Sequence, residues 1–115
     1  MAFHPEPAFK HGQAPRTAIV LCNLGTPDEP TAPALRRYLA EFLGDHRVVE
    51  IPKAVWMLIL HGIILNTRPK KSGHAYEQIW NKERNESPLR TFTRSQGENL
   101  AVALQDHPHV IVAWA

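Results

Sequence analysis

The chain contains a single cysteine, Cys22, among its 115 residues. One thiol excludes an intramolecular disulfide, and its place in a predicted strand favours a reducing compartment. No apolar run approaches the ~18 residues that a membrane-spanning helix requires. Residues 1–15 also lack the continuous apolar segment of a secretory signal peptide. These absences together predict a cytoplasmic protein.

An excess of charge of one sign is also missing. The chain has 13 lysines and arginines and 11 aspartates and glutamates, for a net charge of +2. The one dense basic cluster comprises Arg68, Lys70 and Lys71. A nucleic-acid-binding surface needs a clustered basic face, so the interleaved acids exclude this class of partner. The hydrophobic fraction of 43% suits a folded globular protein, and 115 residues form one domain at most.

Motifs for metals and nucleotides are absent too. The seven histidines are scattered, and no pair has the spacing of an HExxH metal site. We therefore interpret most of the histidines as surface residues. The glycine patterns GxGxxG and GxxxxGK[ST], which cradle dinucleotides and nucleoside triphosphates, do not occur.

The first half of the chain reads as a strand followed by a helix. Residues 17–23, TAIVLCN, form a β-branched apolar run without strict alternation, which predicts a strand buried on both faces of a parallel sheet. Thr31 is placed to cap a helix that runs to Leu43, with Gly44 as a left-handed cap residue. Residues 48–51 are expected to form a brief extended piece.

The second half begins with an unusually apolar segment. Residues 55–65 are interrupted only by His61 and Gly62, so they must be buried, lie against a partner or touch a membrane surface. Helices are predicted over residues 71–80 and from Ser87, a capping residue followed by proline. The apolar stripe of that last helix would hold Leu89, Phe92, Leu100, Ala103 and Leu104. Residues 109–115 predict a second buried strand.

This order of elements predicts an open α/β sheet with right-handed crossovers. Two strands are too few for a stable sheet, and the chain stops within a predicted strand at Ala115. We therefore expect the sequence to be the first part of a longer protein.

The loop NLGTPDEP, residues 23–30, lies where open α/β sheets bind ligands, after the carboxyl end of a strand. Asn23 and Thr26 can make local hydrogen bonds, and Gly25 permits close approach or a positive φ. Leu24 would point at whatever lies above the sheet. From composition alone, a stiff turn that leads into a helix is the favoured interpretation of the loop.

Three segments, in order, resemble the amino-terminal part of the bacterial ferrochelatases, enzymes that insert ferrous iron into a porphyrin. They are VLCNLGTPDEPTAPALRRYLAEFLGDHRVVEIP, ILHGIILNTRPKKSGHAYEQIW and ESPLRTFTRSQGENL. The similarity extends over residues 17–115.

The resemblance implies an α/β, chelatase-like fold, with this chain as the first part of a Rossmann-like parallel-sheet domain with helices on both faces. Residues 17–115 would be that partial domain, and residues 1–16 a flexible lead-in. The macrocycle would lie in a cleft closed by a carboxyl-terminal half that this chain lacks. Residues 48–71 would form a lip over the cleft, which can face the membrane that holds the substrate. Peripheral association with the inner membrane is therefore expected.

The resemblance also implies a set of porphyrin-binding residues. Leu24 matches a residue that faces the ring, Val48 falls in the lip, and Tyr76 matches a pocket tyrosine. Arg68 and Ser87 match residues near the propionates. A porphyrin is a flat apolar disc with carboxylates, so apolar and aromatic contacts with a guanidinium and a hydroxyl suit it.

Three of these residues have plainer interpretations. Tyr76 lies four residues before Trp80 and could pack against it in the core. Arg68 could be a solvated charge on a helix, and Ser87 could serve as a helix cap, alone or in addition to binding.

The metal-handling histidine of the family and its partner glutamate lie beyond residue 115. We therefore expect no catalytic residue, no metal ligand and no tightly bound cofactor in this chain, which alone should be inactive. Protoporphyrin IX and ferrous iron are the expected substrates of the full-length enzyme. The alternatives are a coproporphyrin ferrochelatase, or a non-catalytic α/β module that binds heme, phosphate or a protein through its apolar segment.

Overall fold

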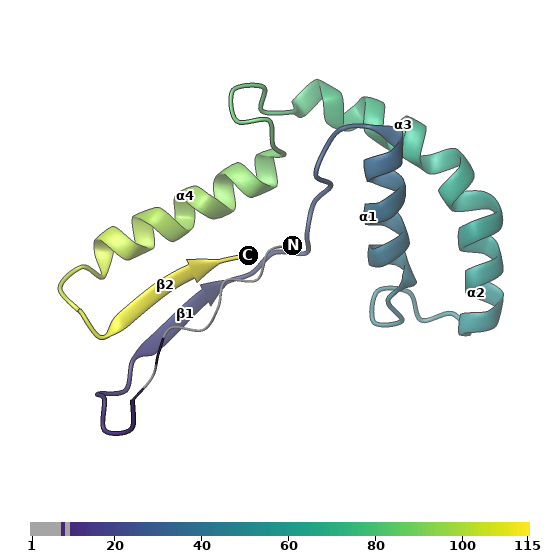
Figure 1. Cartoon of the computed structure of the whole chain (residues 1–115). Coiled ribbons are helices and arrows are strands. Elements are labelled where there is room, and N and C mark those ends of the chain that lie inside the picture. Colours follow the sequence, from purple (N-terminus) through teal and green to yellow (C-terminus); the bar gives the residue numbers. More distant parts are fainter. Residues whose placement is uncertain (1–7, 9) are drawn as a thin grey trace.

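The computed structural model describes residue 8 and residues 10–115, so most of the proposed lead-in, residues 1–7 and 9, lies outside the described residues. Seven elements follow one another: β1 Thr17–Leu21, α1 Ala32–Gly44, α2 Lys53–Ile59, η1 Leu60–Ile64, α3 Leu65–Ile79, α4 Pro88–Ala103 and β2 Val110–Trp114. Figure 1 shows two lobes: β1, β2 and α4 form a sheet lobe, and α1 to α3 form a helical lobe. The radius of gyration is 18.7 Å, against about 13 Å for a compact chain of this length. The molecule is therefore open and elongated.

The sheet lobe joins the two ends of the described chain. Strands β1 and β2 are parallel, with Thr17 opposite Val110 and Leu21 opposite Trp114. All the helices lie between these strands in the sequence, as the α/β prediction requires. Helix α4 runs alongside the pair (Figure 1). The α/β class is confirmed.

The prediction that both strands are buried on two faces is wrong for the described residues. Val20 is 54% exposed and Ile111 is 43% exposed. Helix α4 packs on the sheet, whereas α1 to α3 pack on one another beside it (Figure 1). In the part of the chain that the structure describes, helices therefore cover one face of the sheet, and the expected helices on the other face are not seen.

Helix α1 begins and ends differently in detail from the prediction. Thr31 occupies the N-cap position, but its side chain makes no capping hydrogen bond; the hydroxyl instead donates to Glu29 Oε2 at 3.4 Å. Gly44 is the last helical residue, and the following Asp45 has an extended conformation with φ −77°. The left-handed cap at Gly44 is therefore wrong. The extended piece at residues 48–51 is also wrong, since a turn and irregular backbone occupy it.

The predicted helix over residues 71–80 begins earlier, because α2, η1 and α3 form one continuous helical segment. Pro69 lies inside α3 and has no N–H to donate to the carbonyl four residues back. That carbonyl, Leu65 O, accepts a hydrogen bond from Arg36 Nη1 of α1 at 2.5 Å. The long side chain from α1 thus replaces the donor that the proline lacks, and the helix continues.

The π-helical turn η1 is stabilised in a similar way. Asn66 Nδ2 donates to His61 O at 3.1 Å and to Gly62 O at 3.0 Å. A π-helical turn disturbs the regular hydrogen-bond ladder and leaves carbonyls in need of donors.

Leu60 and Leu65 are buried, whereas Leu58 is 77% exposed and Ile63 is 60% exposed. The apolar segment is therefore half core and half surface.

Helix α4 begins as predicted. Ser87 is the N-cap, and its Oγ accepts a hydrogen bond from Arg90 N at 3.3 Å. The expected apolar stripe is only partly correct, since Phe92 is 66% exposed and Leu89 is 43% exposed. The buried residues of α4 are Thr93 and Gly97, because small side chains let the helix approach the sheet closely.

Candidate functional site

Among the hollows that the described residues line, the first lies where the two lobes meet. Its volume is about 600 Å³, and its lining comes from the loop after β1, from α1 and the turn after it, from α4 and from the end of β2. Leu24 and Val48, two of the predicted porphyrin-binding residues, both line it. The structure therefore brings these residues together from segments that are distant in the sequence.

The loop that carries Leu24 is held by polar contacts. Gly25 has a positive φ of +87°, as the sequence allowed, and its N–H donates to Asn23 Oδ1 at 2.7 Å. Asn23 Nδ2 in turn donates to Thr93 Oγ1 on α4 at 2.9 Å. These contacts fix the backbone on both sides of Leu24. The Leu24 side chain itself is 80% exposed.

One polar prediction in this loop is wrong. The Thr26 hydroxyl is buried without a hydrogen-bond partner within the described residues. Pro27 follows it and carries no N–H, so the nearest backbone donor is missing.

The second hollow, of about 470 Å³, lies within the helical lobe. Residues of α1, α2, η1 and α3 line it, among them Trp56, Arg68, Ser72 and Tyr76. Arg68 and Tyr76 therefore border one space, with the guanidinium at an exposed position and the Tyr76 ring half-buried. The Tyr76 ring also contacts Trp80 edge to face, with centroids 6.4 Å apart. Core packing and a place in the hollow thus coexist at Tyr76.

Tyr38 and Phe42 line both hollows, and the sequence analysis did not identify them as candidate site residues, although they lie in the helix predicted to run to Leu43. Their rings stack with centroids 5.7 Å apart and planes 11° apart. Tyr38 Oη donates to Gly25 O at 3.3 Å, and partial burial, with a smaller contribution from Tyr76, raises the pKa of the Tyr38 hydroxyl. Two aromatic residues four positions apart, directly after a strand-end loop, were the available signal.

Ser87 lines neither hollow. It is only 1% exposed, and its hydroxyl caps α4. The structure therefore separates it from the other four predicted residues.

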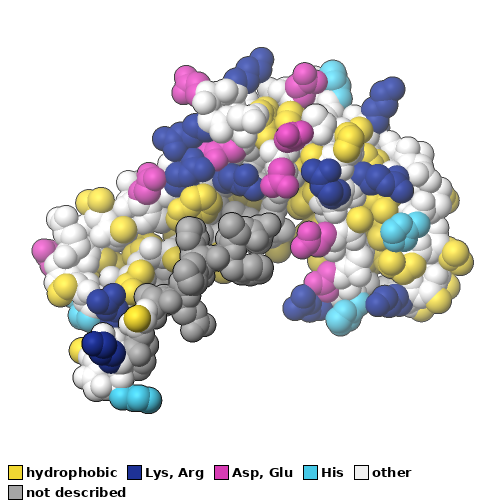
Figure 2. Space-filling view, in the orientation of Figure 1, with side chains coloured by type: hydrophobic (Ala, Val, Ile, Leu, Met, Phe, Trp, Pro, Cys, Tyr) yellow, Lys and Arg dark blue, Asp and Glu magenta, His cyan; other side chains and the backbone are white. Residues whose placement is uncertain are grey.

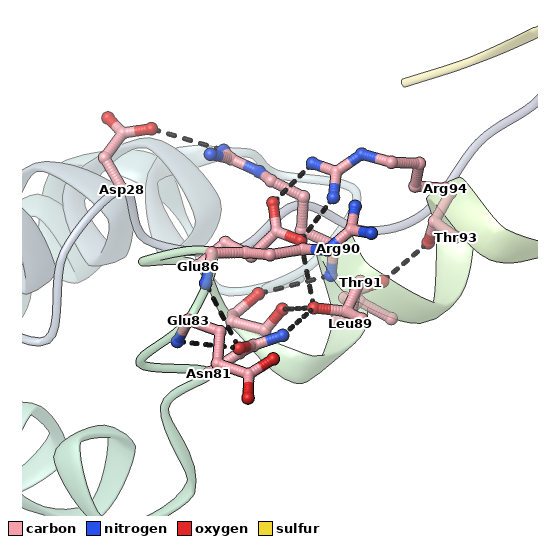
Figure 3. Close-up of polar contacts among 11 residues, drawn as sticks. Asp28, Asn81, Glu83, Glu86, Leu89, Arg90, Thr91, Thr93 and Arg94 are labelled. Carbon is pink, nitrogen blue, oxygen red and sulfur yellow. Dashed lines mark hydrogen bonds and ion pairs between the residues drawn. The ribbon is translucent and has the colours of Figure 1, made fainter.

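Around the start of α4, next to Ser87, lies a network of charged groups that sequence reasoning did not identify (Figure 3). Glu86 is 4% exposed and forms a two-pronged ion pair with Arg94. The hydrogen bonds from Arg94 lower the pKa of the Glu86 carboxyl, so it remains ionised. On the same helix, Arg90 reaches Asp28 of the β1–α1 loop at 3.3 Å.

Neither hollow has the donor set of a metal site. No group of three or more His, Cys, Asp or Glu side chains within the described residues could hold a metal ion. His74 lies 3.9 Å from Glu77, and both are exposed. Figure 2 shows the histidines spread over the surface. Within the same described part, no helix combines the length and apolar character needed to cross a bilayer.

Comparison with known proteins gives a consistent result. The family model named ferrochelatase matches residues 16–115. A ferrochelatase from Brucella anthropi is 60% identical over 101 residues, which cover 88% of this chain and 29% of the relative. Ferrochelatases from Brucella ovis and Brucella suis are each 55% identical over 109 residues, or 95% of this chain and 31% of theirs. No solved structure matches the chain.

The chain thus spans somewhat under a third of the length of the curated relatives that it matches. The family match covers the strand-end loop, both hollows, α4 and β2. It leaves out only the first residues, which carry none of the candidate site. The chain therefore belongs to the ferrochelatase family.

Proposed function

We propose that the chain supplies porphyrin-binding surface to an enzyme that inserts ferrous iron into protoporphyrin IX. Family membership supports the reaction class. The observation that carries the binding role is the pair of hollows, which meet at the Tyr38–Phe42 stack and together contain Leu24, Val48, Arg68 and Tyr76.

The chemistry of these linings suits a macrocycle. Leu24 and Val48 present apolar side chains that are 80% and 43% exposed, and transfer of a ring onto them removes apolar area from water. Tyr38, Phe42 and Tyr76 add aromatic surface for stacking. Arg68 is a single guanidinium at the edge of the second hollow, where it can form a two-pronged hydrogen-bonded pair with a propionate.

The exposed apolar side chains of the lip support a peripheral membrane role. Val55, Leu58 and Ile63 are 53%, 77% and 60% exposed. An apolar surface of this kind lowers its free energy by contact with acyl chains. We accordingly propose a cytoplasmic protein that touches the inner membrane through α2 and η1, from which a hydrophobic porphyrin can enter the hollows.

Within this proposal the chain binds and orients the porphyrin, and iron handling falls to the remainder of a full-length enzyme. Insertion requires a base that takes two pyrrole protons and ligands that deliver the ferrous ion. The described residues hold no cluster suited to such an ion. The chain alone should therefore bind porphyrin without inserting iron.

The test is a titration of the purified chain with protoporphyrin IX, followed by absorbance and tryptophan quenching. Loss of a charge-assisted hydrogen bond at Arg68→Ala should weaken binding by roughly 10- to 100-fold. Tyr76→Ala should also weaken it, whereas Lys70→Ala, an exposed residue on the same helix, should not. An affinity for protoporphyrin IX that is unchanged in both Arg68→Ala and Tyr76→Ala would favour a non-catalytic module that binds through its apolar segment.

A second titration addresses the substrate. Coproporphyrin carries four carboxylates, whereas the described lining of the second hollow offers one cationic side chain, Arg68. In the first hollow, Arg37 and Arg90 share the lining with the acids Asp28, Glu41 and Asp45. Tighter binding of protoporphyrin than of coproporphyrin is expected. The reverse order would assign the chain to a coproporphyrin ferrochelatase.

A further inference from the structure

The indole of Trp114 stands at the end of β2 on the wall of the first hollow. The residue is 37% exposed, so part of the ring is open to solvent. Helix α4 supports it at two points. The Arg94 Cζ atom lies 5.2 Å from the ring centroid, and Gly97 lies so close that an added Cβ would be 3.0 Å from Trp114 Cδ1.

The Arg94 guanidinium is itself held in place by hydrogen bonds to Glu86. Its Nη1 donates to Glu86 Oε1 at 2.5 Å, and its Nη2 donates to Glu86 Oε2. Thr91 Oγ1 donates to Glu86 Oε1 at 3.0 Å, and Asn81 Nδ2 donates to Thr91 Oγ1 at 3.1 Å. Figure 3 shows these groups pointing toward one another. The network leaves the guanidinium little freedom to move away from Trp114.

A buried ion pair of this kind is weak support for stability by itself, because desolvation offsets much of the attraction. A fixed guanidinium over an indole has a specific effect, since it is attracted to the ring face and limits the ring to one orientation. Gly97 completes the restriction from the helix backbone. The same arrangement therefore fixes the angle of one aromatic wall of the hollow.

We propose that Trp114 contacts the ligand of the first hollow, a flat aromatic macrocycle, and that Glu86 and Arg94 are positioning residues for its indole. This inference rests on the proposed function for the identity of the macrocycle. It does not depend on that function for the positioning, which is a property of the chain alone.

The experiment uses the 115-residue chain labelled with 5-fluorotryptophan. Its three tryptophans should give three fluorine NMR resonances. The resonance that is missing from the spectrum of Trp114→Phe is that of Trp114. Arg94→Gln and Glu86→Gln should each shift the Trp114 resonance and leave those of Trp56 and Trp80 in place. Lys82→Gln, an exposed charge loss before the network, is the matched control.

Addition of protoporphyrin IX to the unmodified chain should shift or broaden the Trp114 resonance. Trp114→Ala should weaken binding by about two- to tenfold, and Trp114→Phe should retain most of the affinity, because the phenyl ring keeps an aromatic face. Arg94→Lys keeps the charge but not the planar fork, so it should fail to restore the native Trp114 resonance.

The outcomes separate the two ideas. Folded Arg94→Gln and Glu86→Gln variants with lower melting temperatures but an unchanged Trp114 resonance would overturn the positioning role. Porphyrin binding that leaves the Trp114 resonance unmoved would overturn the ring contact while the proposed function stands. Absence of porphyrin binding would overturn both the ring contact and the binding role of this chain, and the Arg94→Gln spectrum would still decide the positioning.

Discussion

Arg36 Nη1 of α1 lies 2.5 Å from the carbonyl oxygen of Leu65, the group that Pro69 leaves without a helical donor. The same nitrogen donates to Asn66 Oδ1 at 3.0 Å. One side chain thus ties α1 to the start of α3. Arg68 and Tyr76 lie further along the same helix α3.

Replacement of Arg36 by Met should therefore destabilise the chain by about 1–3 kcal/mol, because it leaves the carbonyl of a buried leucine without a donor. Urea unfolding followed by circular dichroism measures the change. Arg37→Met is the matched control, since Arg37 is exposed one position further along α1. Equal stability losses in the two variants would contradict the special role of Arg36.

Ser87→Ala should cost about 1 kcal/mol through loss of the N-cap of α4. The shift of the urea midpoint reports it, and Ser95→Ala, exposed on the same helix, should have little effect. If Ser87 acts only as a cap, the variant should bind protoporphyrin with unchanged affinity when fully folded. A large loss of affinity in the folded variant would instead place Ser87 in the binding surface, as the family resemblance implies.

Gly25→Ala should destabilise by roughly 1 kcal/mol, because a side chain at φ +87° is strained. Space is not the difficulty, since the added Cβ would stand 3.7 Å from Tyr38 Cε2. Gly44→Ala serves as the control: it is helical and faces open space, so it should be neutral or slightly stabilising. The melting temperature should fall for Gly25→Ala and should stay unchanged or rise slightly for Gly44→Ala.

The stability of the chain should fall as the solution is acidified. The Glu86 carboxyl has a folded pKa below its ordinary value of 4.5, mainly through the hydrogen bonds from Arg94. A lowered folded pKa gives stability that is complete above the unfolded pKa and is lost as the pH falls through the folded one. Asp45, held near pKa 2 by Arg47, acts in the same direction from about pH 4 downward.

Urea midpoints measured from about pH 7 to about pH 3 test this dependence. Glu86→Gln should be less stable than the unmodified chain at neutral pH and should lose less stability on acidification. A slope identical to that of the unmodified chain would show that Glu86 titrates alike in the folded and unfolded states, contrary to its contacts with Arg94 and Thr91.

Tyr38→Leu should weaken protoporphyrin binding by about two- to tenfold, because it removes one ring of the stack on which the two hollows meet. Tyr38→Phe keeps the ring and loses only the long hydrogen bond to Gly25 O, so it should bind almost as the unmodified chain does. Absorbance titration compares the two. Equal affinity of Tyr38→Leu and the unmodified chain would remove the stack from the binding surface.

Local signals in the sequence predicted several elements correctly. A serine followed by proline marked the start of α4, and β-branched apolar runs marked both strands. The family resemblance named Leu24, Val48, Arg68 and Tyr76, which the structure distributes between two adjoining hollows.

Features that depend on distant partners could not be predicted. Pro69 removes a helical donor by its own chemistry, and the donor that replaces it comes from Arg36 on another helix. Glu86 and Arg94 lie eight residues apart across a helix start, so no helical spacing rule pairs them. The exposure of Val20 and Ile111 reflects the lack, among the described residues, of a layer over that face of the sheet.

The pairing of β1 with β2 has a consequence for how the chain folds. The two strands lie near opposite ends of the described sequence, so their hydrogen bonds form only after a very long loop has closed, at a large entropic cost. The contacts of α1 with η1 and α3 are closer in sequence and can form earlier. The helical lobe should therefore be the folding nucleus, and the hollow between the lobes should be the last feature to form.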